Sequence, residues 1–224
     1  MGTIVTIDGP AASGKSSVSR ELASRLGWRW VSTGAFYRGL AYVARELAVD
    51  LDSAQVLADL AHSKEWEVLL TSEKTKVLFR GTDVTDKIGL EDVGGIASKI
   101  SHYPEVREAL LGAQRACGAA EAKGLVAEGR DCGTVVFPNA PAKIYLTASS
   151  ESRAARRAAE EGADPESIIA AQKQRDKQDT TRKAAPLAVP ANALVVDTSE
   201  MNFEQVVDAV EKFVRGRLSS ESQT

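Results

Sequence analysis

The residues with the strongest chemical signature lie close to the N-terminus. They run Gly9-Pro10-Ala11-Ala12-Ser13-Gly14-Lys15-Ser16 and form a complete G-x-x-x-x-G-K-[ST] motif. Glycines let the backbone curl so that successive N–H groups point at phosphate oxygens, and a helix beginning at Lys15 adds the positive end of its dipole. Lys15 can reach the β- and γ-phosphates, and the Ser16 hydroxyl is placed to ligate Mg²⁺. The motif predicts a nucleoside triphosphate site, in which we include the neighbouring Ser17.

A polar stretch at residues 150–182 carries two sets of charged side chains at helical spacing. The first set is Arg153, Arg156 and Arg157, and the second is Arg175, Asp179 and Arg182. Each set shares one helix face. Such faces are often solvated surface with intrahelical salt bridges, but phosphoryl transfer between two polyanions requires dense positive charge. Because the chain also carries a phosphate loop, we interpret the stretch as a functional lid.

Two further arginines follow predicted strands. Arg38 comes shortly after Thr33-Gly34, and Arg130-Asp131 directly follows Gly129. In an open parallel sheet, ligands bind in the crevice outside the carboxyl ends of the strands. We therefore expect both arginines to point toward the phosphate loop.

The elements that must position these residues alternate along the chain. Five short apolar runs are predicted as strands, at residues 3–8, 28–32, 125–127, 143–147 and 194–196, and helices are predicted from Lys15 and from about Ala35 to Ala48. Strands alternating with helices indicate an α/β fold with a parallel sheet covered on both faces.

Two stretches break this alternation. Residues 67–71, 76–80 and 82–85 predict a small antiparallel meander, with turns at Ser72-Glu73-Lys74 and Arg80-Gly81-Thr82-Asp83. Helices are predicted near 90–101 and from Pro104 to about Ala122. Residues 150–182 predict two exposed helices hinged at Gly162-Ala163-Asp164-Pro165, and the polar tail at 219–224 is expected to be frayed.

Composition excludes several classes of protein. The 224 residues include 28 basic and 31 acidic side chains, so the net charge of −3 provides no broad cationic field for a nucleic-acid polymer. No apolar stretch approaches the roughly 18 residues of a membrane span. We expect a cytoplasmic protein with no membrane or nucleic-acid partner, and a monomer.

Beyond the phosphate loop, several stretches resemble the bacterial cytidylate kinase family. They are Ile7-Asp8-Gly9-Pro10 through Gly14-Lys15, Thr33-Gly34-Ala35-Phe36-Tyr37-Arg38, Pro104-Glu105-Val106-Arg107, residues 129–138, and Arg175-Asp176 through Asp179, Arg182 and Pro186-Leu187. They extend over nearly the whole chain. Together they are far more specific than the phosphate loop, which many kinases share.

The resemblance implies a three-layer P-loop nucleoside-monophosphate kinase fold with a five-stranded parallel core, a small antiparallel insert and a helical lid. The core would comprise residues 1–33, 124–149 and 183–224. The monophosphate-binding region would comprise 34–123, with the insert at about 66–86, and the lid 150–182. The implied reaction is transfer of the γ-phosphoryl group of ATP to CMP or dCMP, with Mg²⁺.

The family pattern also implies roles for individual residues. Thr33, Arg38 and Arg130 would surround the CMP phosphate; Ser98, Arg107 and Asp131 would line the cytosine; Arg175, Asp179 and Arg182 would reach the sugar and the transferring phosphates. ATP would be bound by residues 9–17 with Arg153, Arg156 and Arg157, and Lys15, Arg130, Arg175 and Arg182 would be catalytic. Chemistry supports Asp131 independently, because a carboxylate accepts from the amino group of cytosine and repels the O4 oxygen of uracil.

Three positions depart from the family pattern. Ser32 stands where the family usually has Asp, so any role of that carboxylate is lost or moved. Glu128 replaces the usual Asp, and its longer side chain could hold Mg²⁺ through water. Cys132 replaces a residue that is commonly Met, and a packing role is expected for it.

Two alternatives remain open from the sequence. One is a phosphate-loop kinase for another small acceptor, such as UMP, AMP or shikimate. The other is an ATP- or GTP-driven switch, which would need elements that respond to the γ-phosphate and signal to a partner.

Overall fold

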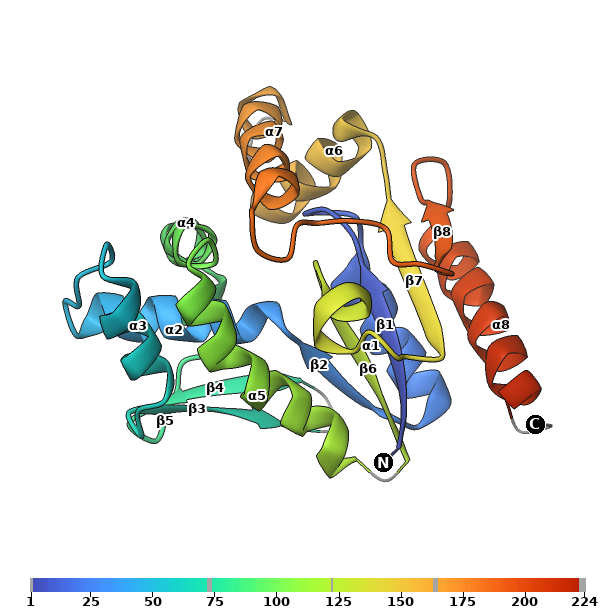
Figure 1. The fold of residues 1–224 in the computed structure, drawn as a ribbon. Helices are drawn as coiled ribbons and strands as arrows, with labels where there is room; N and C mark the ends of the chain where they lie inside the picture. Colours follow the sequence, from blue (N-terminus) through green and yellow to red (C-terminus); the bar gives the residue numbers. More distant parts are fainter. Residues whose placement is uncertain (1, 72–73, 122, 163–164, 222–224) are drawn as a thin grey trace.

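The computed structural model describes residues 2–71, 74–121, 123–162 and 165–221, with the backbone alone described at lid residues 160, 161, 165–167, 171 and 175. A five-stranded parallel sheet forms the centre of the fold (Figure 1). Its strands, in spatial order, are β2 (Arg29–Ser32), β6 (Gly124–Gly129), β1 (Thr3–Asp8), β7 (Ala142–Thr147) and β8 (Leu194–Asp197). The predicted α/β fold with five parallel strands is confirmed.

Helices cover both faces of this sheet and create two apolar cores. On one face, α1 (Lys15–Leu26) and α8 (Phe203–Glu221) bury aliphatic side chains against the strands; on the other face lie α2 (Gly34–Glu46) and α5 (Pro104–Ala120). Strand β6 contributes to both cores, because Leu125 and Ala127 face one and Val126 faces the other. Near-continuous burial along β6 explains its run of apolar residues.

The register of the central strands aligns their carboxyl ends. Asp8, the last residue of β1, pairs with Gly129, the last residue of β6, and Ser32 at the end of β2 pairs with Glu128. The segments that follow these strands therefore leave the sheet at one edge. These segments are the phosphate loop, the start of α2 and Arg130-Asp131.

The predicted meander is present as a three-stranded antiparallel sheet with strands β3 (Trp66–Leu70), β4 (Thr75–Phe79) and β5 (Thr82–Asp83). Residues 72 and 73 of its first predicted turn lie outside the described residues. The backbone N–H of Ser32 donates to Thr75 Oγ1 at 3.0 Å, and Arg29 Nη1 donates to the Leu70 carbonyl at 3.0 Å. The insert is therefore attached to the edge strand β2 through specific hydrogen bonds.

The segment predicted as a lid, for which we keep that name, consists of α6 (Ser150–Glu161) and α7 (Pro165–Thr181), which lie above the carboxyl ends of the strands (Figure 1). They share a small apolar cluster of Ala154, Ala158 and Ile168. Residues 163 and 164 of the predicted hinge lie outside the described residues. α4 (Glu91–Ile100) faces the lid across the cleft described below.

Three features of the fold were absent from the sequence prediction. α3 (Ala54–Ala61) is only eight residues long, although Ser53 caps it by accepting from the Val56 N–H. α8 buries Val206, Val207, Val210 and Val214 and continues to Glu221. The predicted fraying is therefore wrong for residues 219–221, which are helical. Residues 222–224 lie outside the described part. Cys132–Val136 forms a π-helical turn.

Among the described helices, none has the length and apolar character needed to cross a membrane.

The attachment of the insert provides a test of the fold. Thr75→Val preserves side-chain shape but leaves the Ser32 N–H without its acceptor, so we expect urea denaturation to show a loss of about 1–3 kcal/mol in the free energy of unfolding. The matched control is Thr82→Val on the exposed strand β5, for which we expect a change within about 0.5 kcal/mol. Equal effects of the two substitutions would contradict the proposed attachment.

Candidate active site

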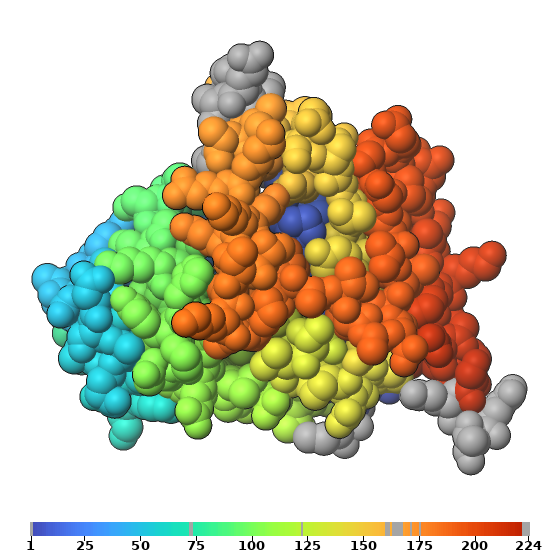
Figure 2. Space-filling model, turned by 45° about the horizontal axis from the view of Figure 1, so that its top comes forward, coloured from blue at the N-terminus to red at the C-terminus, as the bar shows by residue number. Residues whose placement is uncertain are grey.

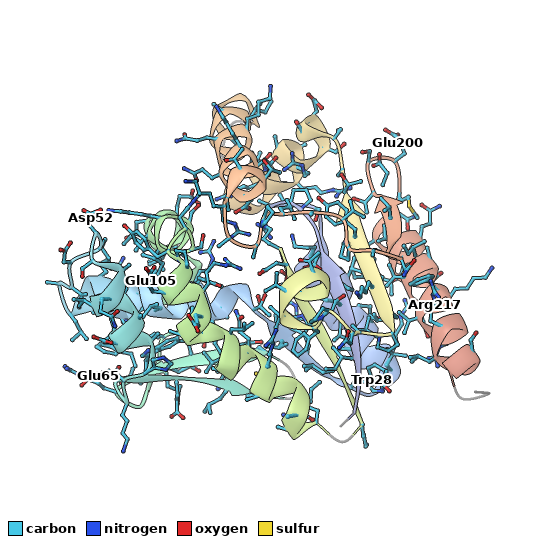
Figure 3. All side chains as sticks on the ribbon, in the orientation of Figure 1. Trp28, Asp52, Glu65, Glu105, Glu200 and Arg217 are labelled. Carbon is cyan, nitrogen blue, oxygen red and sulfur yellow. The ribbon has the colours of Figure 1, made fainter. Side chains whose placement is uncertain are left out.

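A cleft of about 600 Å³ opens at the carboxyl ends of the strands. Its walls come from the phosphate loop, the ends of β2 and β6, the first turns of α2, the face of α4 and parts of the lid. Figure 2 shows blue atoms of the N-terminal part of the chain at the bottom of a hollow framed by the yellow and orange atoms of the lid. In Figure 3 side chains fill the space between the lid and the strand ends, whereas the labelled Asp52, Glu65 and Arg217 lie at the edge of the molecule.

The phosphate loop adopts a curled backbone that only certain residues allow. Gly9 has φ +149°, and a Cβ there would lie 2.0 Å from the Leu146 carbonyl oxygen. Gly14 has φ +86° at the N-cap of α1, and Ala12 also adopts a positive φ of 56°. This curl turns the loop around the N-terminus of α1, an arrangement suited to phosphate.

Lys15 is buried within the loop. Its Nζ donates to the Pro10 carbonyl at 2.6 Å. Burial and the nearby charge of Arg130 lower the pKa of Lys15 to about 7, although Glu128 and Asp8 oppose the shift. An incoming anion would stabilise the ammonium form, so this amine is poised to gain a proton when a triphosphate binds.

Glu128 connects the phosphate loop with β2. Its Oε1 accepts hydrogen bonds from Ser16 Oγ at 3.0 Å and from Ser32 Oγ at 2.6 Å. Serine at position 32 therefore engages the carboxylate of the neighbouring strand. The pair of Ser16 and Glu128 presents oxygen atoms to the cleft, the ligand type that Mg²⁺ prefers.

Thr33 and Arg38 lie on the wall near the start of α2. Thr33 Oγ1 donates to the Glu128 carbonyl at 2.9 Å, and Arg38 Nη1 donates to the Ile88 carbonyl at 2.8 Å. Burial lowers the pKa of Arg38, and the positive charges of Arg157 and Arg130 act in the same direction, against Glu91. The guanidinium of Arg38 therefore lies in an electropositive region that favours an anionic ligand.

Asp131 and Arg107 form a buried ion pair at one end of the cleft. Arg107 also lies over the Tyr37 ring, 5.4 Å from its centroid. Asp131 and Tyr37 line the cleft, whereas Arg107 supports them from behind. Ser98 lines the same region, where its hydroxyl donates to Gln178 of α7 at 3.0 Å.

Arg130, Asp179 and Arg182 bring β6 and the lid together. Arg130 Nε donates to Asp179 Oδ2 at 2.8 Å, and although burial opposes the charge, this partner holds the pKa of Arg130 above its ordinary value. Arg182 is buried, and burial together with Arg107 lowers its pKa. Within the described residues, the buried Arg182 Nε has no hydrogen-bond partner. A donor without an acceptor beside a cleft of arginines fits an oxyanion ligand.

The three arginines of α6 contact different parts of the protein in this structure. Arg157 lines the cleft and pairs with Glu91 of α4. Arg153 Nη1 donates to the Ala11 carbonyl at 3.2 Å, and its Nη2 reaches Asp176 of α7 at 2.6 Å. Arg156 donates to the hydroxyl and carbonyl of Thr198. Arg153 and Arg156 anchor the lid to the core in this structure, and their contact with ATP stays a prediction.

Most of the predicted site residues share the cleft. Those on its wall are Ala11, Ala12, Gly14, Lys15, Ser16, Ser17, Thr33, Arg38, Ser98, Glu128, Arg130, Asp131, Arg157, Asp179 and Arg182. Gly9, Pro10 and Ser13 form the buried part of the loop, where Ser13 Oγ donates to the Pro10 carbonyl at 3.1 Å. The side chain of Arg175 lies outside the described part of the chain.

Sequence reasoning missed several residues of the wall. Ser101 follows α4 and lies near Arg182, whose Nη1 donates to its hydroxyl at 3.5 Å. Trp30 and Thr75 reach the cleft from β2 and the insert. Tyr37 had a signal, since it lies one position before Arg38 in the stretch shared with the family. Ser101 and Thr75 had none, because they reach the site only through tertiary packing.

Sequence comparison identifies relatives of the whole chain. The family model described as cytidylate kinase matches residues 5–216. A cytidylate kinase of Bdellovibrio bacteriovorus is 65% identical over 97% of this chain and 100% of its own length. A cytidylate kinase of Klebsiella pneumoniae is 42% identical over 96% of each chain.

Solved structures support the fold independently. A gluconokinase from Sinorhizobium meliloti superposes with a TM-score of 0.54 at 16% identity, covering 100% of this chain and 97% of that one. At this level of identity the similarity supports the fold alone.

The lowered pKa of Lys15 predicts proton uptake on ATP binding. Because Lys15 has a pKa of about 7 in the free protein, it is mostly neutral at pH 8, and the bound triphosphate raises that pKa. We expect isothermal titration calorimetry at about pH 8, in buffers of different ionisation enthalpy, to show uptake approaching one proton. Lys15→Met should abolish the uptake, and Lys212→Met on the exposed side of α8 should preserve it. Buffer-independent binding enthalpy in the unmodified protein would contradict the prediction.

Proposed function

The chain belongs to the cytidylate kinase family, and from this we propose that it transfers the γ-phosphoryl group of ATP to CMP or dCMP, releasing ADP and the nucleoside diphosphate. It is a nucleoside-monophosphate kinase. The observation that carries the assignment of this chemistry to the cleft is that Arg38, Arg130, Arg157 and Arg182 line the same cleft as the phosphate loop. Within the described residues, the buried Nε of Arg182 has no hydrogen-bond partner. Two facing polyanions require such a concentration of donors.

The donor nucleotide is assigned to the phosphate loop. Backbone N–H groups of residues 9–17 and the N-terminus of α1 would bind the phosphates of ATP. Lys15 would leave the Pro10 carbonyl for the β- and γ-phosphates. Arg157 is the arginine of α6 on the wall of the cleft, and its guanidinium would exchange Glu91 for the triphosphate.

The acceptor is assigned to the region between α2, α4 and β6. Thr33, Arg38 and Arg130 would hold the CMP phosphate, and Asp131 with Arg107 and Ser98 would recognise the cytosine. A carboxylate accepts a hydrogen bond from the N4 amino group of cytosine, whereas the O4 atom of uracil would repel it. The ion pair with Arg107 supports this assignment, because it orients Asp131 before substrate arrives.

The residues near Ser16 fit a magnesium ion. Ser16 Oγ and the Glu128 carboxylate are oxygen ligands on the cleft wall, 3.0 Å apart, and they lie beside the loop that would hold the β- and γ-phosphates. Ser16 would hold Mg²⁺ directly, and Glu128 through water. The ion supplies neutralisation of charge on the phosphate oxygens.

Catalysis then depends on positioning and charge. The acceptor is already a phosphate anion, so no general base is required. Lys15, Arg130, Arg175 and Arg182 would stabilise the charge on the transferring phosphoryl group. Closure of the lid over α4 would exclude water and suppress hydrolysis of ATP. Asp179 would contact the sugar while retaining its pairing with Arg130.

Family membership decides between the alternatives left open by the sequence. It favours a monophosphate kinase over a nucleotide-dependent switch and over a shikimate kinase. The monomeric state, the cytoplasmic location and the absence of a polymeric partner stay predictions.

A panel of acceptors tests the function. With ATP and Mg²⁺, we expect coupled measurement of ADP to give the highest kcat/KM with CMP or dCMP. UMP and AMP should be at least about tenfold poorer, the cost of one mismatched polar contact. Hydrolysis of ATP that is independent of any acceptor would contradict the kinase assignment.

The role of Asp131 is tested by comparing two bases. Asp131→Ala should lower kcat/KM for CMP, because one base-edge contact is lost. We expect the loss of transition-state stabilisation to be about 1–3 kcal/mol. The value for UMP should fall less, so the CMP-to-UMP ratio should shrink; this ratio cancels any general damage from the unpaired Arg107. An unchanged ratio would reject Asp131 as the residue that reads the base.

A further inference from the structure

Asp8 is a buried carboxylate to which the proposed function assigns no role. It ends β1 directly before the phosphate loop, has no exposed surface and does not line the cleft. Aspartate is almost never fully buried unless it is paired. Its Oδ1 accepts from the Cys132 N–H at 2.8 Å, and its Oδ2 accepts from the Gly133 N–H at 2.7 Å.

These two N–H groups open the helical turn at Cys132–Val136. The first N–H groups of any helix lack partners within the helix and need external acceptors. Asp131 occupies the N-cap position, where an aspartate would ordinarily accept them with its own side chain. Here it makes no such cap bond, and its carboxylate instead pairs with Arg107. Asp8 supplies the missing cap from the neighbouring strand.

The fit of the turn against Asp8 is tight. A Cβ at Gly133 would lie 2.8 Å from Thr6 Oγ1, 2.9 Å from Pro190 Cγ and 3.2 Å from Asp8 Oδ2. Only glycine therefore lets the turn approach the carboxylate this closely. Asp8 is separated in the sequence from Cys132 by 124 positions and from Gly133 by 125 positions.

We propose that Asp8 is a positioning residue for the acceptor nucleotide: by capping the turn after Arg130-Asp131, it frees the Asp131 carboxylate to face the base and holds Arg130 toward the phosphate. The proposal rests on the function proposed above. Asp8 would contact no substrate atom, and its effect on the acceptor passes through the backbone of residues 130–133.

Because the cap depends on the charge of the Asp8 carboxylate, its strength should depend on pH. Burial raises the pKa of Asp8 to about 6, and the charge of Asp131 adds to the rise, whereas the two N–H donors and Lys15 lower it. Two further titratable groups lie near Asp8, namely Cys132 in the turn and Tyr145 on β7. Burial raises the pKa of each, and the charge of Asp8 adds to the rise. Above pH 6 the carboxylate accepts both N–H groups. As the pH falls through about 6, protonation removes negative charge from the cap and weakens it.

Asp8→Asn tests the proposal with an isosteric change. Its amide keeps one acceptor and places an NH₂ against the other N–H, so we expect the KM for CMP to rise about tenfold or more. The KM for ATP should rise by a smaller factor, because Asp8 acts on Lys15 only through its charge. The matched control is Asp83→Asn, whose carboxylate caps Thr85 in the insert, away from the cleft, and both KM values should be unchanged. Equal rises in both KM values, or no rise for CMP, would overturn the proposal.

A second measurement uses the unmodified chain and applies even if Asp8→Asn fails to fold. Cytidine 5′-sulfate is the probe, because its anion does not titrate near pH 6 as a phosphate does. We expect its affinity to weaken as the pH falls through about 6, in step with NMR shifts of the Cys132 and Gly133 amide protons. Amide shifts that stay constant across this range would overturn the proposal. Failure of the unmodified chain to phosphorylate CMP would instead reject the proposed function.

Discussion

The pairing of β1 with β6 is the constraint on which the site depends. Asp8 lies opposite Gly129, so the phosphate loop and Arg130-Asp131 leave the sheet side by side. The neighbours of this pair complete the cleft. β2 pairs with β6 and brings Thr33 and α2 to the same edge of the sheet. β7 pairs with β1, so the start of α6, which follows β7, lies beside the phosphate loop. Without this register, the donor and acceptor regions would have no common crevice.

Charge is concentrated within a chain whose total charge is nearly balanced. The net charge of −3 conceals a set of arginines gathered around one cleft. Burial holds the pKa values of Arg38 and Arg182 below the ordinary value, which means that their charged forms lack sufficient compensation from the protein. In the proposed function, substrate phosphates would supply that compensation, because a buried charge is costly unless it is paired. The same imbalance suits two small polyanions bound side by side.

The lid and the acceptor side already contact each other across the cleft. Ser98 of α4 donates to Gln178 of α7, and Glu91 pairs with Arg157 of α6. Side chains assigned to substrates thus have protein partners that hold them near the site. Arg153 and Arg156 serve another purpose, since they join the lid helix to the phosphate loop and to Thr198. Recruitment of substrates would therefore exchange some lid contacts while leaving its anchors in place.

Local patterns in the sequence determined the fold class, the phosphate loop and the antiparallel insert, because period-two and helical spacing depend on neighbours along the chain. They missed α3, which is short, and they placed three arginines on one helix face without showing that Arg153 and Arg156 turn toward the core. Only the tertiary structure decided which group each side chain meets. Asp8 meets a turn more than 120 positions away, and Glu128 meets Ser16 and Ser32 from two other elements. Spacing defines a face, whereas non-local packing selects its partner.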